Sequence, residues 1–268
     1  MYLTDTHCHL DFNSFDEDRQ QVLERAWEAG INRILNPGID LQTSQSALEL
    51  SELHSKLYAA VGIHPNSASS WDARSLPALR EMAAHPKAAA IGEIGLDYYW
   101  DTTPVPDQKQ AFRDQLALAA ELGLPVVVHN REATEDVLAI LLAWQAELAA
   151  TGSTLAQRPG VLHSFSGNSA QAELAAAANF YIGITGPVTF KNAPELHAVV
   201  RETPLERLLI ETDAPFLAPH PVRGKRNEPA YVRHIADKIA LLKGCTIDDV
   251  ASQTARNARH LFGWSGEV

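Results

Sequence analysis

The sequence predicts an α/β protein with a (β/α)8 barrel, also called a TIM barrel. Eight short runs rich in Val, Ile and Leu alternate with longer amphipathic stretches. That alternation is typical of a parallel sheet covered by helices, because its strands are buried on both faces. Eight such units in a chain of 268 residues match the usual size of this barrel. Histidines and carboxylates follow several of the runs, where such a barrel places its active site.

The elements follow one another in a regular order along the chain. Predicted strands span residues 2–7, 31–38, 57–65, 88–97, 124–130, 160–165, 179–186 and 206–214. Amphipathic helical patterns lie between them, for example over 16–30 and 107–123, and both of these end in glycine, which suits a helix C-terminus. A long loop follows over 214–228, and two helices are predicted over 229–243 and 247–262. We expect these two helices to close the outer ring, the last one being additional to the eight repeats.

The main alternative is an open, doubly wound α/β sheet. Its dinucleotide-binding form is not supported, because the only glycine-rich turn after an early strand, NPGID at residues 36–40, lacks the G-x-G-x-x-G pattern. The chain contains no low-complexity tail and no Ser/Gly linker. We therefore expect a single domain over residues 1–268.

Composition limits the possible partners and compartments. A net charge of −11 argues against a general phosphate-binding surface, although bound metal ions could reverse the field locally. No apolar stretch approaches the roughly 18 residues of a membrane span, and the N-terminus lacks a signal-peptide pattern. The two cysteines, Cys8 and Cys245, do not form a disulfide framework. We expect a cytoplasmic protein, a monomer, with no membrane partner.

Polar side chains gather at the C-terminal ends of the predicted strands. Five of the 11 histidines lie there, and Glu93, Asp97, Glu211 and Asp213 occupy the same positions on two other strands. Because side chains alternate between the faces of a strand, His7 and His9 point the same way and Cys8 points the other way. Glu211 and Asp213 are paired in the same manner. Two nitrogens and two oxygens are thereby offered to the same end of the barrel.

These residues form a candidate metal-ligand set. Imidazole combined with carboxylate suits Zn, Mn or Fe and, with more oxygens, Mg. Six ligands exceed the need of one tetrahedral ion and suit two ions bridged by a carboxylate. Taken singly, each residue also fits a structural role, such as a turn cap for Asp213. The predicted ligands are His7, His9, Glu93, His129, His163 and Asp213.

A basic cluster follows the eighth predicted strand. Arg223, Lys225 and Arg226 surround Gly224 in an otherwise acidic chain. A solvated basic loop is the structural interpretation. The functional interpretation is a phosphate-binding loop at the rim of the site, because glycine lets the backbone approach an anion closely. Two more cations, Lys191 and Arg131, could add to it.

The motifs resemble, in order, those of the TatD family of metal-dependent hydrolases. The resemblance extends from residue 3 to about residue 262 and rests on DTHCHLDF, GIHP, GEIGLDYYW, LPVVVHNREA, GVLHSFSG, YIGITGPVTFK, LLIETDAPFLAPHPVRGKRNEP and NARHLF. It implies a TIM barrel of the amidohydrolase-like group and a two-metal deoxyribonuclease-type phosphodiesterase, with nucleic acid as substrate. An exonuclease acting on single-stranded DNA is the specific expectation.

The resemblance also implies a role for each ligand. The H-x-H pair and Asp213 would bind the first metal, Glu93 would bridge the two ions, and His129 with His163 would bind the second. Two further residues, His64 and Glu211, resemble functional neighbours rather than certain ligands. The family often has Cys where this chain has Ser164, which is not a predicted ligand. Glu93 stands where many amidohydrolases use a modified Lys, which separates this chain from the urease-like members.

The expected reaction is metal-assisted phosphodiester hydrolysis by two divalent ions, which could be Mg, Mn or Zn. Asp213 would be both ligand and proton acceptor for the attacking water, and Glu211 would orient that water. The basic cluster would hold a substrate phosphate. One alternative is hydrolysis of another ester or amide bond in a small-molecule or aminoacyl substrate. The other is a barrel that binds nucleic acid without cleaving it.

Overall fold

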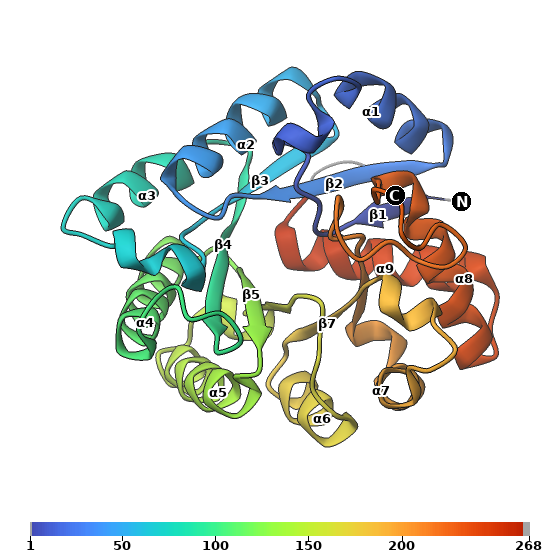
Figure 1. Cartoon of the computed structure of the whole chain (residues 1–268). Helices are drawn as coiled ribbons and strands as arrows, with labels where there is room; N and C mark the ends of the chain where they lie inside the picture. Colours follow the sequence, from blue (N-terminus) through green and yellow to red (C-terminus); the bar gives the residue numbers. More distant parts are fainter. Residues whose placement is uncertain (1, 265–268) are drawn as a thin grey trace.

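A computed structural model of the chain describes residues 2–264. Its strands are parallel and form one sheet in the order β1 to β8, so each strand pairs with its neighbours in sequence (Figure 1). The predicted barrel is therefore confirmed. The strands are β1 Leu3–Asp5, β2 Ile31–Pro37, β3 Leu57–Val61, β4 Ala88–Asp97, β5 Val126–Arg131, β6 Gly160–Leu162, β7 Tyr181–Ile184 and β8 Leu208–Ile210.

Helices follow the strands and surround the ring (Figure 1). They are α1 Arg19–Glu28, α2 Leu41–Leu53, α3 Ser75–Ala83, α4 Val105–Leu122, α5 Thr134–Ala150, α6 Ser169–Ala177, α7 Pro194–Glu202, α8 Val232–Lys243 and α9 Ile247–Phe262. Gly123 ends α4 at φ 67°, as the sequence pattern predicts. The segment predicted as a helix from 229 begins with a 3-10 turn at Pro229–Tyr231. Among the helices of residues 2–264, none combines the length and the apolar character that crossing a membrane requires.

The two ends of the sheet meet through residues that lie beyond the strands. The Thr6 amide donates to the Ile210 carbonyl over 3.2 Å, and the Asp213 amide donates to the His7 carbonyl over 2.8 Å. Asp5 is fully buried here, and its Oδ1 accepts hydrogen bonds from the amides of His7 and Thr212. Burial raises the pKa of Asp5 to about 8. This junction holds the H-x-H segment beside the segment that carries Glu211 and Asp213.

The last helix extends beyond the outer ring in which we expected it. The α9 residues Ala258, Leu261 and Phe262 are buried together with Trp264 against residues of the barrel interior, among them Leu35, Ala60, Val127, Val161 and Leu209. In Figure 1 α9 passes behind the ring of strands, on the side away from their C-terminal ends. The end of α9 therefore covers the N-terminal mouth of the barrel, while its first half, with Val250 and Ala251, is buried in the main core. An amphipathic pattern cannot distinguish these positions, because both bury one apolar face.

Several strands are shorter than predicted, and three of them end just before a candidate ligand. β1 stops at Asp5, β6 at Leu162 and β8 at Ile210, so His7, His163 and Asp213 lie just past the strands. The chain turns there, with a positive φ of 43° at Ser164 and 56° at Asp213. These three candidate ligands are consequently on the first residues of the loops at the C-terminal mouth, whereas Glu93 and His129 lie within β4 and β5.

Candidate metal centre

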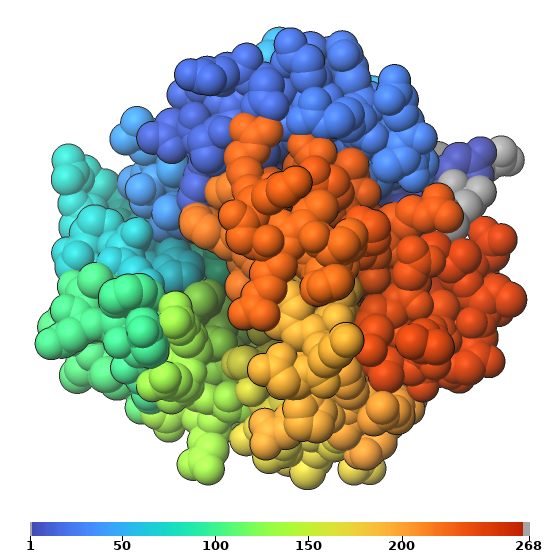
Figure 2. Space-filling view, turned by 45° about the vertical axis from the view of Figure 1, so that its right-hand side comes forward, coloured from blue at the N-terminus to red at the C-terminus, as the bar shows by residue number. Residues whose placement is uncertain are grey.

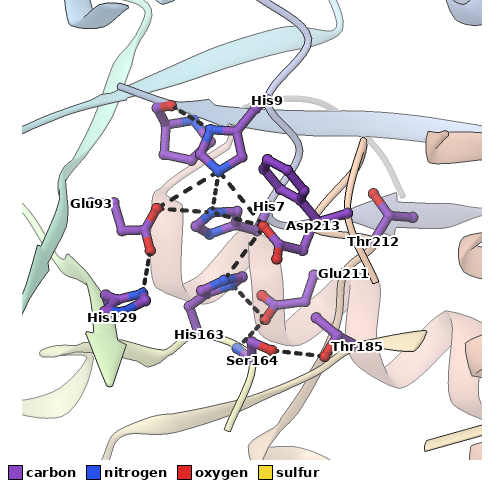
Figure 3. A network of polar contacts seen from close by, with 12 residues as sticks. His7, His9, Glu93, His129, His163, Ser164, Thr185, Glu211, Thr212 and Asp213 are labelled. Atoms are coloured by element: carbon purple, nitrogen blue, oxygen red, sulfur yellow. Dashed lines mark hydrogen bonds and ion pairs between the residues drawn. The ribbon is translucent and has the colours of Figure 1, made fainter. Parts of the chain in front are cut away.

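The predicted ligands converge at the C-terminal mouth of the barrel (Figure 3). The Nε2 atoms of His7 and His9 are 3.2 Å apart. Asp213 Oδ1 lies 3.8 Å from the first of these nitrogens and 3.6 Å from the second. His163 Nε2 is 3.7 Å from the same oxygen, and its ring stacks on that of His7 with centroids 3.4 Å apart. Three imidazole nitrogens therefore surround one carboxylate oxygen.

Glu93 stands between two groups of histidines. Its Oε2 is 3.3 Å from His7 Nε2 and 3.7 Å from His9 Nε2. Its Oε1 is 2.9 Å from His129 Nδ1 and 3.7 Å from His64 Nε2. One buried carboxylate thus presents a different oxygen to each group.

The donor atoms of these side chains fall into three compact sets. Three sets have donor atoms that all lie within 4.8 Å of one another: His7 with His9 and Asp213, His64 with Glu93 and His129, and His7 with His163 and Glu211. His163 therefore lies with His7 and Asp213, and the histidine nearest to His129 is His64, whose ring centroid is 4.2 Å away. The geometry brings all eight predicted metal-ligand and catalytic residues into one centre.

Glu211 is fully engaged within the protein. Its Oε1 lies 2.8 Å from His163 Nδ1 and accepts a hydrogen bond from the Ser164 amide, while Thr6 Oγ1 donates to its Oε2 over 3.2 Å. A Cβ on Gly183 would lie 2.4 Å from Oε1, so the carboxylate needs a glycine at this position of β7. Glu211 is placed to hold the His163 ring rather than to face solvent.

Other groups orient the histidines from behind. His9 Nδ1 is 3.2 Å from the Pro37 carbonyl, which can only accept a hydrogen bond, so Nδ1 carries the proton and Nε2 keeps its lone pair. His129 Nε2 is 3.0 Å from Asp97 Oδ2. The backbone amide of Asn66 donates a hydrogen bond to His64 Nδ1 over 3.1 Å, so the proton of the His64 ring is on Nε2. His64 therefore offers a hydrogen-bond donor toward Glu93.

Sequence reasoning did not assign roles to Asp97 and Asp5, although both contact ligands. The sequence could have indicated a role for Asp97, because side chains alternate along a strand and residues 93 and 97 therefore lie on the same face. Asp5 shares the alternation of His7 and His9, but its contact could not be predicted, because its partner Thr212 lies 207 residues away in the sequence. Only closure of the barrel brings these two residues together.

Burial and neighbouring charge set the ionisation of the centre. Burial lowers the pKa of His7, and it lowers that of His64 to about 3, so both rings are neutral near pH 7. Although burial opposes it, Glu211 and Asp213 raise the pKa of His163 to about 10. Burial alone would raise the pKa of Glu93, but the surrounding histidines hold it well below its usual range. Glu93 is consequently an anion at neutral pH.

The donor set fits divalent metal ions. Imidazole nitrogens and carboxylate oxygens are the ligands that Zn, Mn and Fe prefer, and hydrogen bonds to the far side of His9 and His129 are typical of ligating imidazoles. Among residues 2–264, the buried His7 Nδ1 has no hydrogen-bond partner in the protein. A divalent cation held here would be ligated by imidazole lone pairs and by the anionic Glu93 carboxylate together.

The basic loop divides into bound and free cations. Arg226 is held by Asp18, with each of two guanidinium nitrogens 2.7 Å from a carboxylate oxygen. Arg223 lies over the Phe190 ring at 4.5 Å, and the side chain of Lys225 forms no hydrogen bond or ion pair with residues 2–264. Asn227 ties the loop to the site, because its Nδ2 donates to the carbonyl of Thr212. Figure 2 shows the loop, in orange, over the middle of this face.

A parallel eight-stranded barrel whose mouth gathers histidines and carboxylates from many strands defines a class of metal-dependent hydrolases. A sequence model of one such family, TatD related DNase, matches residues 4–263 of this chain. The chain belongs to this family and is a metal-dependent hydrolase.

Individual relatives are similar over nearly their whole length. An uncharacterized metal-dependent hydrolase, YabD, of Bacillus subtilis is 47% identical over 260 residues, covering 97% of this chain and 98% of the relative. The 3'-5' ssDNA/RNA exonuclease TatD of Escherichia coli K12 is 37% identical over 265 residues, covering 97% and 98%. The crystal structure of YJJV, a TatD homolog from Escherichia coli K12, superimposes with a TM-score of 0.90 at 31% identity, covering 98% of both chains.

Proposed function

We propose that this protein is a two-metal nuclease that removes nucleotides from the 3′ end of single-stranded nucleic acid. The observation that supports it best is the position of Glu93, whose two oxygens face two separate groups of imidazole nitrogens. With one oxygen facing each group, Glu93 would be shared by two metal ions if both were bound. The relatives named as 3'-5' ssDNA/RNA exonucleases support the choice of substrate.

Six side chains would hold the ions, which could be Mg, Mn or Zn. His7, His9 and Asp213 form one group, His129 lies on the far side of Glu93, and His163 stacks against His7. When bound, divalent ions of this kind polarise a phosphoryl oxygen and lower the pKa of water. The roles of the protein groups follow from their contacts and their exposure.

Asp213 is the proposed proton acceptor. It is the most open carboxylate of the centre, with 15% of its side chain exposed against 4% for Glu93 and none for Glu211. A base that takes a proton from water and passes it to solvent needs this access. Glu211, which is fully buried against His163, would position that imidazole. His64, with its proton on Nε2, would donate a hydrogen bond to a substrate oxygen or to Glu93.

The basic loop is proposed to hold a substrate phosphate through Arg223 and Lys225, whose charges no carboxylate of residues 2–264 occupies. Replacing Lys225 with Ala should raise KM for an oligonucleotide and reduce the salt dependence of log KM by about one unit of slope. Replacing Arg226 with Ala should instead cost about 1 kcal/mol of stability, because its guanidinium is paired with Asp18. Steady-state kinetics at several salt concentrations and thermal unfolding separate these effects. Equal salt slopes in Lys225→Ala and the unmodified protein would remove Lys225 from phosphate binding.

Removal of metal tests the proposed chemistry directly. After exhaustive chelation and desalting, cleavage of a 5′-labelled single-stranded oligonucleotide should fall below detection, and adding Mg²⁺, Mn²⁺ or Zn²⁺ singly should restore it. Because the label is at the 5′ end, shortening by single nucleotides reports attack from the 3′ end. Activity that survives in metal-free protein would exclude the proposal. Products cut only at internal positions would exclude an exonuclease.

Two other functions remain open to test with the same protein. Hydrolysis of another ester or amide bond would appear as faster turnover of a p-nitrophenyl ester than of bis-p-nitrophenyl phosphate. Tight oligonucleotide binding without cleavage in any metal would favour a binding barrel. The full set of candidate ligands argues against a binding barrel, and the relatives named as exonucleases favour phosphodiester hydrolysis over cleavage of another bond.

A further inference from the structure

Two aromatic side chains stand exposed immediately after the strand that carries Glu93. Tyr99 and Trp100 are 49% and 51% exposed, although large aromatic groups are normally buried when nothing binds them. Their ring centroids are 4.8 Å apart and their planes are perpendicular, at 89°. The two rings therefore form a corner. A planar ligand that stacks on one ring therefore also contacts the other ring, whose plane is perpendicular to that of the ligand.

A shared carboxylate links this corner to the metal centre. Asp97 Oδ1 accepts hydrogen bonds from the backbone amides of Tyr99 and Trp100, over 3.0 Å and 3.1 Å. Its other oxygen, Oδ2, contacts His129 Nε2 at 3.0 Å. Asp97 therefore orients a proposed metal ligand with one oxygen and the aromatic turn with the other. The turn cannot move far without disturbing that contact.

The segment after the turn is braced as well. Thr102 Oγ1 donates to the side chain of Asn66 over 3.1 Å, and Asn66 Nδ2 donates to Asp97 Oδ2 over 3.3 Å. The backbone amide of Asn66 also donates a hydrogen bond to His64 Nδ1. The aromatic corner and the histidine group around Glu93 thus share one hydrogen-bonded frame. A backbone turn held in place loses little conformational freedom when a ligand binds the rings that it carries.

A positive charge accompanies the rings. The Arg131 guanidinium carbon lies 3.7 Å from the Tyr99 ring centroid and 5.6 Å from that of Trp100. Arg131 is exposed and ends β5, two residues after His129. It covers one face of Tyr99, so Trp100 has the freer ring. An aromatic surface beside a cation matches a nucleotide, which combines a flat base with an anionic phosphate.

We propose that Trp100, supported by Tyr99 and Arg131, is a stacking platform for one unpaired base next to the metal centre. The proposal rests on the proposed nuclease function and adds a specificity device to it. Perpendicular rings cannot stack two successive bases in parallel, so the corner takes a single base. A base in a duplex must first leave its own stack, at a cost of a few kcal/mol. The platform therefore favours substrates whose terminal bases are already unpaired.

The test compares two oligonucleotides of one length. One is a plain thymidine 12-mer, and in the other the three residues at the 3′ end lack bases but keep the sugar-phosphate backbone. Trp100→Ala should raise KM about tenfold for the plain oligonucleotide and leave it unchanged for the base-free end, because stacking on an aromatic side chain contributes about 1–3 kcal/mol per base. Trp100→Phe keeps a ring and should retain most of the affinity. Tyr2→Ala serves as a control, because Tyr2 is an exposed aromatic residue ahead of β1.

Binding gives a second readout that does not depend on cleavage. Titration of chelated protein with the plain oligonucleotide should quench tryptophan fluorescence in the unmodified protein and in Tyr2→Ala, and much less in Trp100→Phe. An equal rise of KM for both oligonucleotides in Trp100→Ala, or unchanged quenching in Trp100→Phe, would overturn the platform. Quenching that depends on Trp100 without cleavage in any metal would uphold the platform and reject the nuclease. A change in the sedimentation of free Trp100→Ala, with both KM values unchanged, would make the corner a self-association surface and also overturn the proposal.

Discussion

Replacing Glu93 with Gln is expected to abolish almost all hydrolysis and to reduce the number of bound metal ions. Glu93 is 4% exposed in its side chain, and each of its oxygens faces a different group of histidines. Glutamine keeps the shape and one oxygen but loses the negative charge shared by the two groups. A loss of several kcal/mol of transition-state stabilisation corresponds to a rate reduction of about a thousandfold or more.

Metal content and kinetics should be measured on the same preparations. Inductively coupled plasma mass spectrometry would count ions per chain in Glu93→Gln and in Glu202→Gln, a control at an exposed position at the end of α7. Circular dichroism would show that both variants are folded. Full metal content together with normal kcat in Glu93→Gln would rule out a bridging role.

The second large effect is expected at Asp213. Asp213→Asn should lower kcat by about 10²- to 10⁴-fold, the usual contribution of general acid–base catalysis, because an amide cannot accept the proton from water. The amide oxygen can still contact the neighbouring imidazoles, so metal content should fall less than in Glu93→Gln. Measurements of kcat, KM and metal stoichiometry distinguish these outcomes.

Comparison with Glu211→Gln tests whether Asp213 is the proton acceptor or only a metal ligand. Glu211 faces His163 and the Ser164 amide and is fully buried, so this variant should mainly weaken metal binding, and excess metal should recover part of kcat. Excess metal should not rescue Asp213→Asn. Asp101→Asn, at an exposed position of the loop after β4, controls for loss of charge near the mouth. If excess metal restored Asp213→Asn to full activity, Asp213 would be a ligand only.

Local sequence patterns were enough to predict the barrel and the positions of its candidate ligands. The apolar runs identify the strands because a strand buried on both faces must be apolar throughout, and the H-x-H spacing places two imidazoles on one side of the chain. Gly123 marks the end of α4 because the backbone there adopts the left-handed conformation, which favours glycine. Each of these features depends on residues that are close in sequence.

Contacts across the barrel depended on the tertiary structure. The strand predicted over 206–214 stops at Ile210 in the structure, and only closure of the sheet sets Thr212 against Asp5. The same closure stacks His163 on His7. Distances between side chains on different strands follow from strand tilt and register, which no spacing along the chain encodes.

The basic loop and the last helix also combine a feature that the sequence predicts with contacts that only the fold decides. Composition revealed three clustered cations, but only the fold showed that Asp18 binds Arg226 and that Lys225 has no such partner among residues 2–264. Amphipathicity predicted α9, and packing decided that its end covers the N-terminal mouth of the barrel. The sequence by itself determined which residues form strands, helices and potential ligands, because these depend on local periodicity and side-chain chemistry. The tertiary structure decided which of them meet, because those contacts arise only when the ring of strands closes.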